Sequence, residues 1–232
     1  MIWRLIDVDI PQLTSDGIDF GYACFYYTYF LQSSSTHSPI SSSFDAAGLE
    51  NYINFGKQEP TVSSTVIRSR TEFNSIPLDV EDLWIGRFDA SYMYELSPSR
   101  FQSLKTLVIG NGLFWSVNRL ELNNQNSLQI IYIGDYCFGQ LRVFELDGLS
   151  ELESVVIGER SFRISDKERS DGSYRIVNCP KLKSIQIGDF SFSDYHSFEL
   201  SNLPSLQSID MGESCFFLAP SFSLTGLIDG LI

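Results

Sequence analysis

An eight-residue pattern that recurs along the chain restricts the fold more than any other feature of the sequence. It is clearest in IDMGESCF at Ile209–Phe216. Further copies are IQIGDFSF at Ile185, VVIGERSF at Val155, IYIGDYCF at Ile131, LVIGNGLF at Leu107, LWIGRFDA at Leu83 and IDFGYACF at Ile18, with a remnant, INFGKQEP, at Ile53. Such self-similarity is typical of solenoids, in which units stack in a row and present extended surfaces. The pattern therefore predicts a solenoid.

The glycine in each copy measures the length of the repeat. These glycines stand at positions 21, 56, 86, 110, 134, 158, 188 and 212, so the successive steps are 35, 30, 24, 24, 24, 30 and 24 residues. The longer steps indicate a 24-residue unit with insertions in the serine-rich stretch Ser33–Ser43, in Gln58–Arg70 and in Ile164–Arg175. Polar insertions of this kind are expected in loops at one edge of the stack.

Within a unit, apolar residues predict two short strands. Ile185 and Ile187 alternate with the period of a strand that buries one face, Gly188 supplies a bend, and Phe192 returns to the core. A second apolar pair follows in each unit: Leu120 and Leu122, Phe144 and Leu146, Tyr174 and Ile176, Phe198 and Leu200, and Phe222 and Leu224. No unit has the ten or more residues of helical periodicity that a helix needs, so we expect few or no helices.

The unit resembles a leucine-rich repeat, whose pattern L-x-x-L-x-L-x-x-N/C-x-L is met at its apolar positions by Leu206, Ile209, Met211 and Phe216. The resemblance implies a right-handed coil with a parallel sheet along a concave face. The family's asparagine ladder is absent. One residue beyond its position stand Cys24, Cys137, Ser161, Ser191 and Cys215, which we expect to fill the turn instead.

We divide the chain into degenerate N-terminal repeats with a cap and the serine-rich loop, residues 1–79, and regular units over 80–232. The regular units start near residues 80, 104, 128, 152, 182 and 206. The sequence order predicts about eight units, the Ile18 copy first. Because the final residues, GLIDGLI, are apolar, we expect the C-terminal end to continue in a longer repeat protein or to be covered by another subunit through self-association.

The charge and the cysteine content of the chain indicate which classes of partner and which location to expect. The net charge of −13 disfavours nucleic acid and anionic membranes, whose binding requires a basic face. The sequence shows no signal peptide and no transmembrane segment. Cys137 and Cys215 lie too many units apart to form a disulfide, so we expect buried, reduced cysteines, which together with the absence of an Asn-x-Ser/Thr sequon favours a cytoplasmic location.

The outward side chains of the concave strands mark a candidate binding surface. One outward column reads Asp19, Asn54, Trp84, Val108, Tyr132, Val156, Gln186 and Asp210, and Ile130 stands in the neighbouring column. We call Trp84, Val108, Ile130, Tyr132 and Val156 the apolar patch and expect it to be exposed. Exposed apolar patches commonly bind partners. Two other interpretations stay open: these residue types form strands well, and a loop or the N-terminal segment folds over them.

The sequence does not predict an enzyme or a cofactor. His37 and His196 lie near no recognisable nucleophile, and no C-x-x-C or H-x-x-x-H pattern indicates a metal site. The glycines match neither G-x-G-x-x-G nor a P-loop. We therefore expect a non-enzymatic protein-binding module acting through its concave face. The alternative is a structural or surface-exposed assembly protein that works by end-to-end stacking of solenoids.

Overall fold

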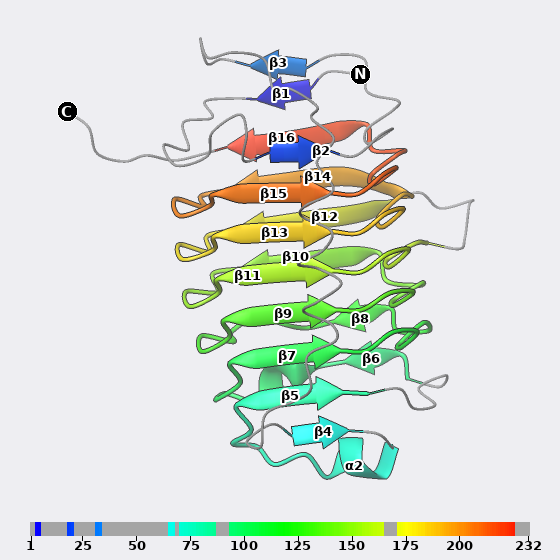
Figure 1. Ribbon diagram of the computed structural model, residues 1–232, viewed down its shortest axis with the longest axis vertical. Helices are drawn as coiled ribbons and strands as arrows, with labels where there is room; N and C mark the ends of the chain where they lie inside the picture. The colour runs from blue at the N-terminus through cyan, green and yellow to red at the C-terminus, as the bar shows by residue number, and fades with distance from the viewer. Residues whose placement is uncertain are drawn as a thin grey trace, which may run out of the picture.

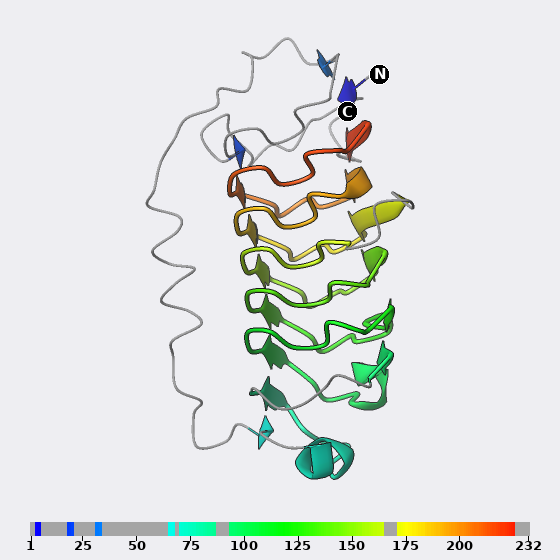
Figure 2. The same cartoon turned by 90° about the vertical axis from the view of Figure 1, so that its right-hand side faces the viewer.

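A computed structural model describes residues 70–86, 93–164 and 171–225, together with the backbone of four short strands at Trp3–Leu5, Ile18–Phe20, Leu31–Ser33 and Thr65–Ile67. The chain is a mainly β repeat solenoid, as predicted, with one sheet along each long side (Figure 1). Viewed at right angles, the two sheets form parallel columns joined by turns at each coil (Figure 2).

The first sheet has eight strands, and every neighbouring pair in it is parallel. In spatial order the strands are β2 (Ile18–Phe20), β15 (Ser208–Met211), β13 (Ser184–Ile187), β11 (Ser154–Ile157), β9 (Ile130–Ile133), β7 (Thr106–Ile109), β5 (Asp82–Ile85) and β4 (Thr65–Ile67). Six of them are the alternating apolar segments predicted from the glycine-marked copies that start at Leu83, Leu107, Ile131, Val155, Ile185 and Ile209.

The second sheet contains the strands predicted from the second apolar pair of each unit. Its order is β10 (Val143–Asp147), β12 (Gly172–Val177), β14 (Tyr195–Ser201), β16 (Ser221–Thr225), β1 (Trp3–Leu5) and β3 (Leu31–Ser33), and a separate pair consists of β6 (Glu95–Leu96) and β8 (Arg119–Leu120). Among the described residues, the helical elements are α2 (Arg70–Asn74) and a 3-10 turn, η2 (Pro98–Arg100).

The order of the stack differs from the order of the repeats in the sequence. The Ile18 copy was expected to begin the stack, but β2 pairs with β15, with Ile18 beside Ile209, at the opposite end from β4. Next to β5 lies β4, where Val66 is the register partner of Trp84. The prediction failed because the edge strand of a parallel sheet pairs through main-chain groups. These groups are the same in every strand, so they do not depend on the order of strands in the chain. The Ile53 copy lies outside the described residues.

Two aromatic ladders fill the core between the sheets. One contains the phenylalanines that end the eight-residue pattern, with ring centroids 4.6 to 5.7 Å apart: Phe114, Phe138, Phe162, Phe192 and Phe216. The other contains Phe144, Tyr174, Phe198 and Phe222, with centroids 4.8 to 5.3 Å apart. Side chains of one ladder meet those of the other edge to face, as at Phe198 and Phe216. This stacking explains the large aromatic residue at the first place in the units from Phe114 to Phe216 and at the second place in the units from Phe144 to Phe222.

Serine and cysteine side chains form one column in the turn after the first strand of the coils from Cys137 to Cys215, as the sequence indicated. The Ser161 hydroxyl accepts a hydrogen bond from the Cys137 backbone N–H at 3.0 Å and donates to the Gly134 carbonyl at 2.7 Å. The Ser191 hydroxyl accepts from the Ser161 N–H at 3.0 Å. The Cys215 thiol contacts the Gly188 carbonyl at 3.2 Å. The column therefore satisfies buried backbone groups between one coil and the next.

The glycine of the pattern is required by the close approach of successive coils. A Cβ at Gly188 would lie 2.7 Å from the Glu159 backbone nitrogen, and a Cβ at Gly134 would lie 2.9 Å from the Asn111 backbone nitrogen. The phenylalanine that follows four residues later has a positive φ, 57° at Phe138 and 54° at Phe192. This conformation is costly for a bulky residue, so the burial and stacking of the ring must offset the strain.

Two fully buried tyrosines, Tyr174 and Tyr195, lead to opposite predictions for loss of the hydroxyl. The Tyr174 hydroxyl is buried without a hydrogen-bond partner, whereas the Tyr195 hydroxyl donates to the Leu141 carbonyl at 2.7 Å. We expect Tyr174→Phe to leave stability unchanged or raise it by up to about 1 kcal/mol, and Tyr195→Phe to lower it by about 1–3 kcal/mol. Urea unfolding followed by circular dichroism measures both. Equal losses in the two variants would contradict this account.

The hydrogen bonds of the serine and cysteine column allow a prediction of how substitution of Ser161 changes stability. Ser161→Ala leaves the Cys137 N–H and the Gly134 carbonyl without their partner, so we expect a loss of about 1–3 kcal/mol. Ser161→Cys should cost less, because cysteine occupies the same column at Cys215. Urea midpoints compare the two variants, and an alanine variant as stable as the cysteine variant would show that the hydrogen bonds are unimportant.

Candidate functional site

The candidate site lies on the outer face of the eight-stranded sheet, away from the core. Strand register places Trp84 beside Val108, Val108 beside Tyr132, and Tyr132 beside Val156. The sequence predicted this column correctly from Trp84 onward. Before Trp84 the structure replaces Asn54 by the register position of Val66, and beyond Asp210 it adds that of Asp19.

The apolar patch is less exposed than the sequence indicated. Val108, Tyr132 and Val156 expose 7, 7 and 4% of their surface and form a cluster separate from the main core. Trp84 packs against this cluster and is half-buried, and Ile130, in the neighbouring column, is also half-buried. The structure therefore brings four of the five predicted residues into one continuous cluster, while the expectation of an open, solvent-exposed patch does not agree with the observed burial.

Hydroxyl side chains flank the apolar patch. Thr106 and Ser154 lie on either side of Ile130 in register, and the column continues through Ser184 and Ser208. The Ser184 hydroxyl donates to the Ser154 hydroxyl at 3.2 Å. The face between β7 and β11 therefore carries apolar and hydroxyl groups without a formal charge.

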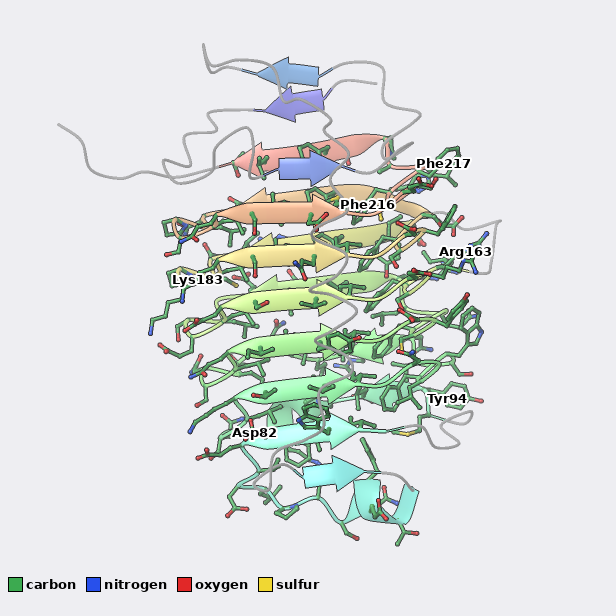
Figure 3. All side chains as sticks on the ribbon, viewed as in Figure 1. Asp82, Tyr94, Arg163, Lys183, Phe216 and Phe217 are labelled. Carbon is green, nitrogen blue, oxygen red and sulfur yellow. The ribbon has the colours of Figure 1, made fainter. Side chains whose placement is uncertain are left out.

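Charged residues stand at the two lateral edges of the sheet. Lys183 lies at the edge where the strands begin and pairs with Glu153 at 2.6 Å, while Arg163 lies at the opposite edge (Figure 3). Lys105 pairs with Glu81 at 2.7 Å, also just before a strand. Exposed pairs of this kind add little stability, so their main effect is to border an uncharged face with charge.

A ladder of acidic residues follows the strands and was not identified from the sequence. The Asp135 carboxylate accepts a hydrogen bond from the Glu159 N–H at 2.9 Å, and the Asp189 carboxylate accepts from the Glu213 N–H at 2.7 Å. Partial burial and the nearby Asp135 and Asp189 carboxylates raise the pKa of Glu159 above its ordinary value. The signal was present, because Asp or Glu follows the glycine in the copies from Ile131 to Phe216.

The described residues offer limited chemistry. Burial, followed by electrostatic interactions with Asp135 and Cys137, raises the pKa of Tyr132 to about 12, so its hydroxyl stays protonated at neutral pH. His196 lies in β14, on the second sheet, whereas His37 lies outside the described residues. Over 70–86, 93–164 and 171–225 no group of three or more metal-ligating side chains occurs. In the same part of the chain, no helix combines the length and apolar character needed to cross a membrane.

Three of the four cysteines are buried and reduced, as the sequence predicted: Cys137, Cys179 and Cys215. Cys24 lies outside the described residues. Burial raises the pKa of Cys137 to about 12 and that of Cys179 to about 11. Neither thiol forms an appreciable amount of thiolate at neutral pH, so both act as small apolar groups rather than nucleophiles.

The raised pKa of Glu159 predicts how its neutralisation changes stability. In the folded state the charged form is disfavoured, so the carboxylate lowers stability above pH 4.5, the ordinary pKa, and this cost disappears as Glu159 becomes protonated on acidification. Glu159→Gln should therefore raise the melting temperature at pH 7, by about 1–2 °C, and leave it unchanged below about pH 4. Thermal unfolding at both pH values tests this, with the exposed Glu213→Gln as control. A rise that persists at low pH would contradict the electrostatic cause.

Comparison of the chain with protein-family models, with curated proteins and with solved structures found no significant match. The resemblance to leucine-rich repeats therefore depends on the repeat pattern alone.

Proposed function

We propose that this chain is a non-enzymatic module that binds a protein partner across the apolar patch on the outer face of the eight-stranded sheet. The observation that carries the proposal is the second apolar cluster, formed by Val108, Tyr132 and Val156 with Trp84 packed against it. The cluster is separate from the main core, so packing of the solenoid interior does not account for these residues. The same positions in the following coils, Gln186 and Asp210, are polar and still form strands.

The shape and chemistry of the face favour a polypeptide partner. Successive strands lie about 4.8 Å apart, so the column from Trp84 to Val156 extends over about 14 Å, a suitable length for a peptide segment lying across the strands. Tryptophan and tyrosine are frequent among the residues that dominate binding energy. Hydroxyl groups beside the patch provide hydrogen bonds, and the net charge of −13 disfavours nucleic acid.

Low exposure of the patch is compatible with two arrangements. A segment of the same chain can cover it and be displaced by the partner, or the patch can be permanently covered and have no partner. The first belongs to the proposal and the second opposes it. The buried, reduced Cys137 and Cys215 support a reducing environment, and we include a cytoplasmic location in the proposal.

Removal of the two aromatic side chains tests the proposed partner site. The wild-type chain and a Trp84→Ser, Tyr132→Ser variant are used as baits in lysate from the source organism, and each captured protein is then purified and its affinity measured. We expect at least one partner to bind the double variant at least about tenfold more weakly, because each aromatic side chain at the centre of an interface contributes on the order of 2 kcal/mol.

The control is Val143→Ser on β10, because Val143 is 52% exposed and lies on the opposite sheet. This variant should bind like the wild type. Circular dichroism and urea unfolding establish that all three chains are folded. Equal affinities of the wild type and the double variant for every partner would show that the apolar patch is not a binding site.

A further inference from the structure

The first described strands of the chain stack on the last ones. β2 pairs in parallel with β15, with Ile18 beside Ile209 and Asp19 beside Asp210. In the second sheet, β1 pairs with β16, where Arg4 is the register partner of Ser223. We call β1, β2 and β3 the N-terminal coil. It occupies the end of the solenoid that the sequence predicted to be open, beyond β15 and β16 (Figure 1).

The N-terminal coil fits this end because it carries the repeat. IDFG at Ile18–Gly21 and IDMG at Ile209–Gly212 are alike in three of four residues. The contacts between β2 and β15 are parallel main-chain pairing in repeat register. Main-chain pairing of this kind is available on every copy of the chain, since a sheet edge does not distinguish its own N-terminal coil from that of a neighbour.

With the N-terminal coil beyond β15 and β16, the strands of the stack do not follow the order of the chain. The N-terminal coil ends at Ser33, beyond β16, whereas β4 begins at Thr65 at the far end of the eight-stranded sheet. β3 and β4 are consecutive among the described strands, yet they lie at opposite ends of a stack about 34 Å tall, at about 4.8 Å for each of seven strand spacings.

In a head-to-tail pair of copies, β3 and β4 of one chain would instead lie close together in the stack. If the N-terminal coil of a second copy stacks on β15 and β16 of the first, β4 and β5 of the second copy follow directly. The stack order is then that of the sequence, with the Ile18 copy before the Leu83 copy. All pairs in the eight-stranded sheet are parallel, so its β2 and β4 ends are complementary edges of one sheet. Joining unlike ends in this way produces an open array.

We propose that copies of this chain assemble head to tail by exchange of the N-terminal coil, which leaves its own β15 and β16 and stacks on those of a second copy. The partner is a second copy of the same chain, and the docking surface is the pair of edges that β15 and β16 present. This proposal is independent of the apolar patch, which lies on the face of the sheet rather than at its end.

Disulfide trapping distinguishes the two arrangements. One full-length chain carries Asp19→Cys and a second, distinguished by a tag, carries Asp210→Cys. Both also carry Cys24→Ser and Cys215→Ser, which removes the native cysteines nearest in sequence to β2 and β15. The chains are unfolded in urea, refolded together at high concentration and oxidised mildly. We expect a disulfide-linked pair containing one chain of each kind, and a ladder of multiples from a single chain that carries both cysteines.

A matched control pairs Asp19→Cys with Val143→Cys, because Val143 is exposed but is not a register partner of residue 19. The control should give little cross-linked product. If it cross-links as well as the register pair, the linkage reports random collision and the proposal fails. If the single variants do not cross-link and the double variant forms only an internal disulfide, the N-terminal coil docks within one chain and the proposal is wrong.

Discussion

Parallel main-chain pairing between one coil and the next is the interaction on which the rest of this structure depends. In the first sheet, β5 to β15 pair residue by residue, with offsets of 24 or 30 that match the glycine spacing. This pairing brings coils so close that a side chain at Gly188 would strike the Glu159 backbone. The glycine of the pattern is therefore a condition for stacking, and the other repeated residues follow from it.

Once coils stack in register, each position of the repeat lies on its counterparts. Phenylalanine at one position becomes a ladder of stacked rings, and serine or cysteine at the preceding position becomes a column of hydrogen bonds. The same geometry turns acidic residues into a ladder of like charges, which adds to the effect of burial in raising the pKa of Glu159. One coil gains most of its contacts from its neighbours, so the units are stable only together.

The stack presents two kinds of surface to possible partners: the outer faces of its sheets and the strand edges at its ends. Trp84, Val108, Tyr132 and Val156 put an apolar column on a face that the core does not use, between edges that carry ion pairs such as Lys183 with Glu153. At the end, β15 and β16 present edges on which the N-terminal coil stacks. The proposed partner site uses the face, and the proposed assembly uses the end.

The sequence by itself determined the repeat length, the two strands of each coil, the apolar core positions and the serine and cysteine column. It did so because each of these depends on residues within one unit and on neighbours a fixed number of residues away. Only the tertiary structure decided the order of the stack and the burial of the apolar patch. Pairing of β2 with β15 joins residues 191 positions apart, such as Ile18 and Ile209, and uses main-chain groups common to every strand. The identities of these residues do not specify which strand edge β2 joins. Periodicity places Tyr132 on the outer face, but it does not show that only 7% of its surface is exposed.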